Sequence, residues 1–191
     1  MPRRTSHTAE QITAAVKEIQ EQTDRGSAIV GAAMMDEMMA VVLQKRMSDM
    51  NRTHYDAFFG QNGPGGTFSN KIELFYAFGL CNETLYKAMH GIRAIRNKFA
   101  HRIEQLSFDD PSIAELVDGL SAYGFDVPNR RQKFIGILTI ILSLVFATGV
   151  DDIRVKSIAE THSEIYIGLL KRFFPEYASI MDKVWKDYNA D

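Results

Sequence analysis

The feature that most constrains the fold is an uncharged apolar run in the last third of the chain. It extends from Phe134 to Thr148 (FIGILTIILSLVFAT), and with its continuation to Val150 it is seventeen residues long. A membrane-spanning helix needs about 20 such residues, with roughly 17 as the lower limit. This run is the only one of its kind, and Thr139 and Ser143 interrupt it. Because the centre of a helical bundle also requires a helix that is apolar on all sides, we expect a buried central helix and no membrane span.

The overall composition is that of a globular protein. The 191 residues are 46% hydrophobic and 24% charged, with a net charge of −2, which excludes disordered, collagen-like and supercharged chains. At this length we expect a single all-helical domain over residues 1–191. The only cysteine, Cys81, cannot form an internal disulfide, and residues 1–7 lack the apolar core of a secretory signal. Both observations fit a cytoplasmic protein.

Helical periodicity dominates the chain and predicts an all-α bundle of about seven or eight helices, without a convincing strand. Residues 8–52 are expected to form an N-terminal helical pair, which opens with a capping box at Thr8. The second helix of the pair is expected at about 27–50. Its methionines have the spacing of core residues, so we interpret them as core filling and not as a metal or cofactor site; they are Met34, Met35, Met38 and Met39.

Residues 53–68 lose the helical period and are expected to form a glycine-rich loop. The loop precedes a helix, and helix N-termini attract phosphate. A phosphate-binding P-loop, however, needs a lysine beside a serine or threonine after its last glycine, and here Thr67 and Phe68 follow. We therefore interpret the loop as a tight connection whose glycines supply positive φ angles. Its candidate residues are Gly63, Pro64, Gly65 and Gly66.

The remaining helices are expected in residues 69–191. Ser69 is predicted to cap the first of them, Asn82 to start the next, and Pro111 to lie in the first turn of another. The buried helix follows, and two more helices are expected at about 151–172 and 175–188.

The most informative stretch is Lys87–Arg102 (KAMHGIRAIRNKFAHR), which contains no acidic residue and carries a local charge of about +5. It is the candidate surface for a nucleic acid or another partner. The residues that we assign to this surface are Lys87, Arg93, Arg96, Lys98, His101 and Arg102. A second, smaller basic cluster consists of Arg130, Arg131 and Lys133.

Within this stretch, Arg96, Asn97 and His101 are the candidate catalytic residues. An arginine beside a phosphate and a histidine that acts as general acid or base could cleave RNA without a metal ion. Arg96 lies about 140° around the helix from His101, so the two meet only where the helix bends or ends, or across a symmetry axis. A structural role is equally consistent with the pattern, since basic side chains stabilise a helix C-terminus.

A family resemblance rests on several linked segments between residues 55 and 113. They are FFGQNGPGGTFSNKIELFYAFGL from Phe58 onward, then IRAIRNKFAH, then LSFDD. The stretch resembles the mannitol operon repressor family of all-helical bacterial transcriptional regulators. One position departs from that pattern, because Gly65 follows Pro64 where the family tends to have leucine. The resemblance implies a repressor-like regulator of a sugar or sugar-alcohol operon.

The same helix resembles the signature of the HEPN superfamily, in which an arginine, a polar residue and a histidine lie within a few positions of each other. Arg96, Asn97 and His101 match that signature. The resemblance implies a homodimer and, as the alternative function, a metal-independent ribonuclease or an inactive RNA-binding module. We favour a regulator without catalysis. We find no helix-turn-helix, zinc finger or basic arm, and we expect no metal and no cofactor.

Overall fold

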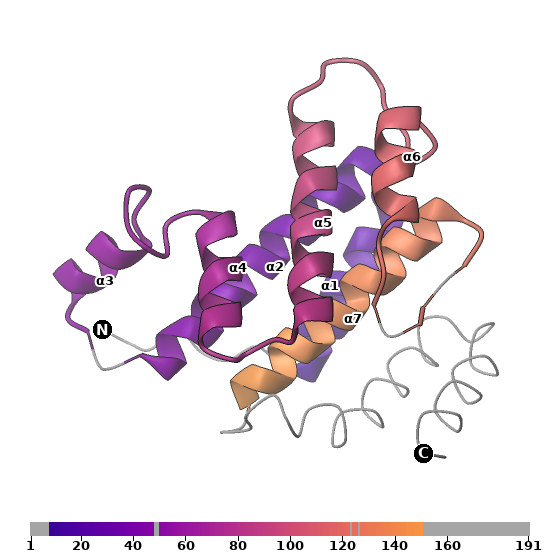
Figure 1. The fold of residues 1–191 in the computed structure, drawn as a ribbon. Helices are drawn as coiled ribbons and strands as arrows, with labels where there is room; N and C mark the ends of the chain where they lie inside the picture. Colours follow the sequence, from indigo (N-terminus) through magenta and orange to yellow (C-terminus); the bar gives the residue numbers. More distant parts are fainter. Residues whose placement is uncertain (1–7, 48–49, 123, 126, 151–191) are drawn as a thin grey trace, which may run out of the picture.

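The structure is a computed structural model that describes residues 8–47, 50–122, 124–125 and 127–150. These residues form seven α-helices and no strand (Figure 1). In chain order the helices are α1 (Ala9–Glu21), α2 (Asp24–Arg46), α3 (Arg52–Phe59), α4 (Phe68–Ala77), α5 (Glu83–Ala100), α6 (Pro111–Asp118) and α7 (Arg130–Val150). The predicted all-α bundle is confirmed. The helices expected at 151–172 and 175–188 lie outside the described residues.

The apolar run forms most of α7, the central helix of the bundle. α7 packs against α1, α2, α5 and α6, and every residue from Phe134 to Val145 is buried. The two polar side chains of the run are satisfied inside the helix, because Thr139 Oγ1 donates to the Ile135 carbonyl and Ser143 Oγ to the Thr139 carbonyl, both at 2.8 Å. The prediction of a buried central helix is confirmed.

Two helices, α2 and α7, are long and apolar enough to cross a membrane by length and composition. In the most apolar window of each helix, 61% of α2 and 83% of α7 is buried inside the bundle. A core helix of a globular bundle passes the same test, so burial accounts for this composition.

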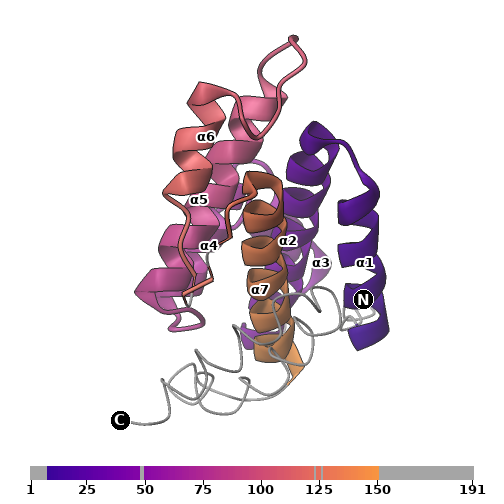
Figure 2. The same cartoon turned by 90° about the vertical axis from the view of Figure 1, so that its right-hand side faces the viewer.

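Figure 2 shows how the helices surround α7, with α1 and α2 on one side of it and α5 and α6 on the other. α2 and α7 share the most extensive helix–helix contact. A row of aromatic rings joins α5 to α7 through the connection before α6. The ring centroids of Phe99 and Phe108 are 5.2 Å apart, and those of Phe108 and Phe134 are 4.8 Å apart.

Three of the predicted helix starts are confirmed, two of them by capping hydrogen bonds. Thr8 and Gln11 form the reciprocal capping box, with bonds of 3.3 and 2.8 Å. The Asn82 side chain accepts a hydrogen bond from the Leu85 amide at 3.0 Å, and Pro111 occupies the first turn of α6.

Both predicted ends of the second helix and the predicted cap of α4 were wrong. The second helix begins at Asp24, three residues before the predicted start, because Thr23 caps it by accepting a hydrogen bond from the Gly26 amide at 3.2 Å. That helix ends at Arg46. The cap of α4 is Thr67 and not Ser69, since the Thr67 hydroxyl accepts from the Asn70 amide at 3.1 Å. At both helix starts a nearby threonine supplies the side-chain oxygen that caps the helix.

The prediction of an unbroken loop over 53–68 was also wrong, because residues 52–59 form helix α3. The Asn51 side chain caps this helix by accepting a hydrogen bond from the His54 amide at 2.9 Å. No residue of α3 is fully buried, and its apolar residues Tyr55, Phe58 and Phe59 span little more than one turn, which is too short for a helical period to stand out in the sequence. The glycine-rich loop is therefore restricted to residues 60–67.

The loop glycines serve a different purpose from the one predicted. Among the described residues, only Gly79 and Gly124 have positive φ angles. In the loop, a Cβ atom on Gly63 would overlap the Ala57 and Phe58 carbonyl oxygens, and one on Gly66 would overlap the Gly60 carbonyl oxygen. Glycine is required there because backbone segments approach closely, not because of φ.

Candidate partner-binding site

Helix α5 carries the basic stretch and is anchored along one side. An apolar stripe runs along α5 at helical spacing, and all of its members are buried: Leu85, Met89, Ile92, Ile95 and Phe99. The helix ends at Ala100, and His101 is its C-cap residue. The basic side chains therefore lie on the rest of the helix surface, and the structure divides them between two flanks.

On the flank of α5 that faces α4, His90 and Tyr86 contact an acidic residue. Both Glu73 carboxylate oxygens accept hydrogen bonds from the Tyr86 hydroxyl at 3.1 Å, and His90 Nε2 lies 3.1 Å from Glu73 Oε1. The Tyr86 ring also packs against Tyr76, with ring centroids 4.7 Å apart. Tyr76 itself is 45% exposed. The sequence shows no acid between residues 87 and 102, but the fold supplies one from α4.

The predicted catalytic residues are only partly brought together. Arg96 Nη1 donates to Asn97 Oδ1 at 3.0 Å, so these neighbours act as one polar unit. His101 is exposed at the end of the helix, and within the described residues no hydrogen bond joins its side chain to Arg96. Arg93 is half-buried, and its Nε atom has no hydrogen-bond partner among the described residues.

The backbone of the residues just after α5 is hydrogen-bonded to a side chain of α2. Arg25 Nη2 donates to the Arg102 carbonyl at 3.0 Å and also to the Glu104 carbonyl. The residue between these two carbonyls, Ile103, is 98% exposed. Arg102 therefore contributes its backbone to the link with α2, and its side chain forms no ion pair within the described part of the chain.

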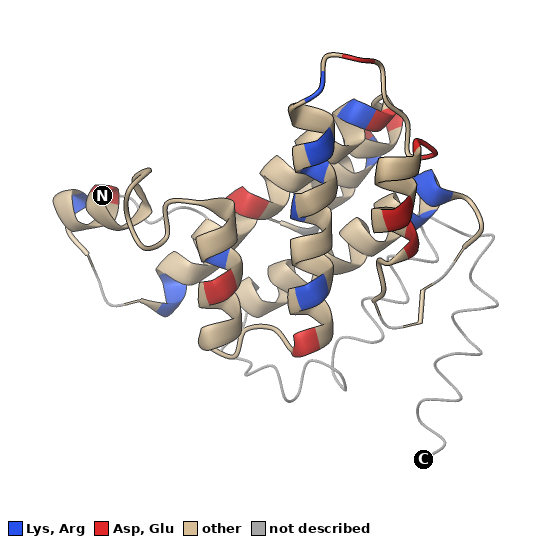
Figure 3. Cartoon of the chain, turned by 45° about the horizontal axis from the view of Figure 1, so that its top comes forward, with Lys and Arg blue, Asp and Glu red and all other residues tan. Residues whose placement is uncertain are grey.

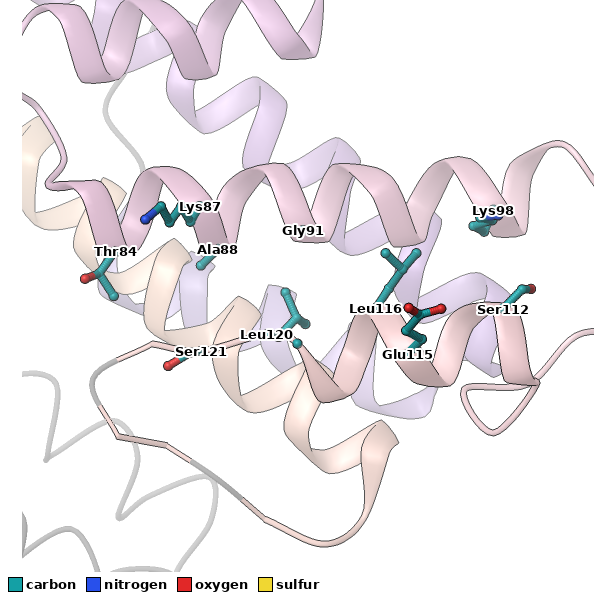
Figure 4. Close-up of a pocket in the computed structure, with 11 residues that line it drawn as sticks. Thr84, Lys87, Ala88, Gly91, Lys98, Ser112, Glu115, Leu116, Leu120 and Ser121 are labelled. Atoms are coloured by element: carbon teal, nitrogen blue, oxygen red, sulfur yellow. The ribbon is translucent and has the colours of Figure 1, made fainter.

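The other flank of α5 borders a groove that separates it from α6 (Figure 4). The groove has a volume of about 660 Å³. Lys87 and Thr84 lie at one end and Lys98 and Ser112 at the other, as Figure 4 shows. Between the ends, α5 contributes the small residues Ala88 and Gly91, and α6 with the residues just after it contributes Leu116, Leu120 and Glu115. Of the six predicted partner-binding residues, the groove includes Lys87 and Lys98.

The charges around this groove are of both signs. Figure 3 shows basic residues along α5 and acidic residues on the neighbouring α6. Lys87 Nζ lies 2.7 Å from Glu83 Oε1, one turn earlier on the same helix, and this hydrogen-bonded ion pair raises the pKa of Lys87. Lys98 and Glu115 form no ion pair within the described residues. Sequence reasoning missed Glu115, Leu116 and Leu120, because only the fold places α6 beside α5.

The side chains of the second basic cluster bond to other elements of the fold. Arg130 forms two hydrogen bonds to the Asp118 carboxylate, at 2.8 and 2.9 Å, and one to Asp109 at 3.0 Å. Arg131 bonds to Asp24, and Lys133 donates to the Asp118 carbonyl at 3.0 Å. These three side chains connect α7 to α2 and α6, so they do not form an open basic surface.

The glycine-rich loop likewise bonds to itself. The Gly65 amide donates to the Phe58 carbonyl at 2.9 Å, and the Gly66 amide donates to the Gly63 carbonyl at 3.0 Å. These two amides point into the loop's own backbone, so they are not directed at a phosphate.

The described residues include one buried free thiol and no cluster of potential metal ligands. Burial raises the pKa of the Cys81 thiol to about 12, so it is protonated and inert near neutral pH. No group of three or more histidine, cysteine or carboxylate side chains that could hold a metal ion occurs in the described part of the chain.

Comparisons with known proteins give a similarity of fold to a solved structure. No family model matches the sequence, and no curated protein matches it. Among solved structures, the fold is similar to that of the MtlR chain in the X-ray structure of the MtlR–HPr complex from Escherichia coli, with a TM-score of 0.58. The alignment has 16% sequence identity and covers 71% of this chain and 98% of that chain. At this identity the similarity establishes an MtlR-like all-α fold.

Proposed function

We propose that this chain is a non-catalytic, repressor-like regulator of a sugar or sugar-alcohol operon that acts by binding another protein. The observation that supports this most is the MtlR-like fold, since the similar chain was solved in a complex with HPr. The resemblance of residues 55–113 to the mannitol operon repressor family agrees with it. We further propose a cytoplasmic protein that forms a homodimer.

Contact with a protein is a better explanation than contact with DNA for two physical reasons. The second basic cluster is bonded within the fold, which removes a surface that phosphates would need. The first basic stretch is divided between two flanks of α5, and acids of the fold accompany its first turn, with Glu73 beside His90 and Glu83 beside Lys87. A surface that reads DNA instead concentrates positive charge on one face.

The direct test is a calorimetric titration of the purified chain with HPr from the same organism. We expect saturable binding at a 1:1 ratio of the two chains. In parallel, transcript levels of the sugar-alcohol operons are measured in cells that lack the chain, and we expect at least one operon to rise and to fall again on complementation. Unchanged transcripts on every sugar alcohol tested would refute the regulatory role.

Binding to DNA is tested separately by fluorescence polarisation with duplexes from those operon promoters. A protein that contacts six or more phosphates loses roughly a thousandfold in affinity between about 50 and 200 mM salt. We expect no such salt-dependent binding. A steep salt dependence would instead identify a repressor that contacts DNA directly.

The second candidate is a metal-independent ribonuclease or an RNA-binding module that uses Arg96, Asn97 and His101. Two features favour it: the hydrogen bond between Arg96 and Asn97, and the exposure of His101 where the helix ends. The test is incubation with RNA in the presence of EDTA, together with sedimentation to determine the oligomeric state. Cleavage that is lost in a folded His101→Ala variant would support the enzyme over the regulator.

A further inference from the structure

The α5–α6 groove has a charge arrangement that no contact within the described residues explains. Lys98 at one end forms no ion pair with a described residue. At the other end Lys87 pairs with Glu83 on the same helix, and both side chains of that pair are largely exposed. Exposed pairs of this type contribute little to stability and exchange partners readily. Both ammonium groups are therefore available to carboxylates that approach the groove from outside.

The spacing of the two lysines matches a helical partner. They are eleven residues apart, which is about 16 Å along the helix axis, and eleven residues are close to three full turns. Both side chains consequently project from the same side of α5. A small ligand with one anionic group cannot reach both, whereas two carboxylates eleven positions apart on a docked helix can.

The surface between the lysines suits the apolar face of such a helix. Its floor is apolar and consists of Ala88, Gly91 and Leu120, with Leu120 Cδ2 packed directly over Gly91, and its edge on α6 is the half-buried Leu116.

Glu115 makes the arrangement directional. It projects from α6 near the Lys98 end, as Figure 4 shows, so it repels an acid and attracts a base at that point. The groove therefore presents three charges in a fixed order: positive at Lys87, negative at Glu115 and positive at Lys98.

We propose that the α5–α6 groove binds an amphipathic helix of a partner protein, with two acidic residues eleven positions apart against Lys87 and Lys98 and a basic residue against Glu115. This inference rests on the proposed function, since it assigns the surface through which a regulator of this type would contact its partner. It follows the general mode in which the apolar face of a helix lies in a groove between two others.

The test uses a fluorescent helical peptide of about 18 residues, titrated with the full chain and followed by anisotropy. The peptide carries a stripe of leucine and alanine, two glutamates eleven positions apart, and one arginine a turn before the second glutamate. We expect the wild-type chain to bind it, and Lys87→Glu and Lys98→Glu each to weaken binding about tenfold. The matched control is Lys17→Glu, which makes the same charge change at an exposed pair with Glu21 on α1.

A charge reversal at Glu115, matched by one in the peptide, distinguishes a loss of binding from a loss of folding. Glu115→Lys should weaken the same peptide about tenfold, and replacing the arginine of the peptide by glutamate should restore its affinity for that variant. No binding by the wild-type chain up to roughly 1 mM, or equal affinities for the wild type and the three groove variants, would overturn the groove assignment.

The outcome is separable from that of the proposed function. If Lys87→Glu and Lys98→Glu leave the affinity for HPr unchanged, the regulatory proposal stands but the groove is not its HPr-binding surface. If the peptide binds and HPr does not, the groove is supported as a helix-binding site and HPr is excluded as the partner.

Discussion

Arg131 joins three segments of the chain with one side chain. Its guanidinium donates to Asp24 Oδ1 at 2.5 Å, and to the carbonyls of Gln20 and Gln22 at the end of α1, at 3.0 and 2.5 Å. The other carboxylate oxygen of Asp24 accepts from the Phe108 amide at 3.0 Å. One partly buried cation thus ties α7 to the end of α1 and the start of α2, and through Asp24 to the residues before α6.

Loss of this side chain should therefore be costly. We expect Arg131→Ala to lower the free energy of unfolding by about 2–4 kcal/mol, because it leaves Asp24 partly buried without its cation. Arg131→Lys should recover less than half of the loss, since one ammonium group cannot reach three acceptors in a planar fork. Urea denaturation measures both values. The control is Arg52→Ala, at an exposed pair with Asp56, where a loss below about 1 kcal/mol is expected.

The neighbouring Arg130 gives stability a pH dependence. Its hydrogen bonds hold the pKa of the Asp118 carboxyl below its ordinary value of 3.8. A depressed pKa in the folded state gives stabilisation that is complete above the ordinary value and is lost as the pH falls through the folded value. We expect the melting temperature of the wild type to exceed that of Arg130→Gln near neutral pH, and the difference to shrink below about pH 4. A difference that stays constant down to about pH 2.5 would contradict this assignment.

At the residue scale, the sequence predicted the basic stretch but not its surroundings. Lys87 and Lys98 could be named as partner-binding candidates because their charge is visible in the sequence. Glu73 and Glu115 could not, since α4 and α6 place them beside α5 only through tertiary packing. The same limit explains Arg130 and Arg131, whose carboxylate partners are 12 and 107 positions away.

At the element scale, packing of α2 against α7 depends on a glycine. A Cβ atom on Gly31 would overlap Cδ2 of Leu138, a buried residue of α7. Overpacking of this type typically costs about 1–3 kcal/mol, whereas alanine in place of glycine gains at most about 1 kcal/mol of helix propensity. The steric overlap with Leu138 therefore outweighs the gain in helix propensity, and alanine at position 31 should lower the free energy of unfolding.

We expect Gly31→Ala to destabilise the protein in thermal and urea unfolding. Gly119→Ala is the matched control, because φ is −74° and the nearest atom to an added Cβ is the Glu115 carbonyl oxygen at 3.4 Å. There we expect a gain of about 0.4–1 kcal/mol, through reduced freedom of the unfolded chain. Equal gains for both variants would show that α2 and α7 do not pack tightly at Gly31.

Helices with a long apolar period were predictable, and the short ones were not. The stripe of α5 and the run in α7 follow from burial, which selects apolar residues at helical spacing. α3 has only two turns and buries no residue, so its helix depends on the Asn51 cap and on local backbone bonds. Caps predicted from residue type were correct at Thr8 and Asn82, but another hydroxyl residue took the role expected of Ser69.

For the whole molecule, we propose that residues 1–191 fold as one domain, and the single tryptophan offers a test. Trp185 lies outside the described residues, so its fluorescence reports on the end of the chain, whereas far-UV circular dichroism reports mainly on the seven helices. A single domain requires both signals to change at the same urea concentration. Two separate midpoints would indicate that the end of the chain unfolds independently.

The contact between α2 and α7 also has a consequence for biosynthesis. α2 ends at Arg46 and α7 begins at Arg130, so the ribosome adds more than eighty residues before the apolar side of α2 meets its main partner. At typical rates of synthesis this interval lasts roughly 4–17 s. During that time the part of α2 that α7 later covers is an exposed apolar surface of the kind that chaperones bind. We expect polypeptides released before α7 is complete to aggregate.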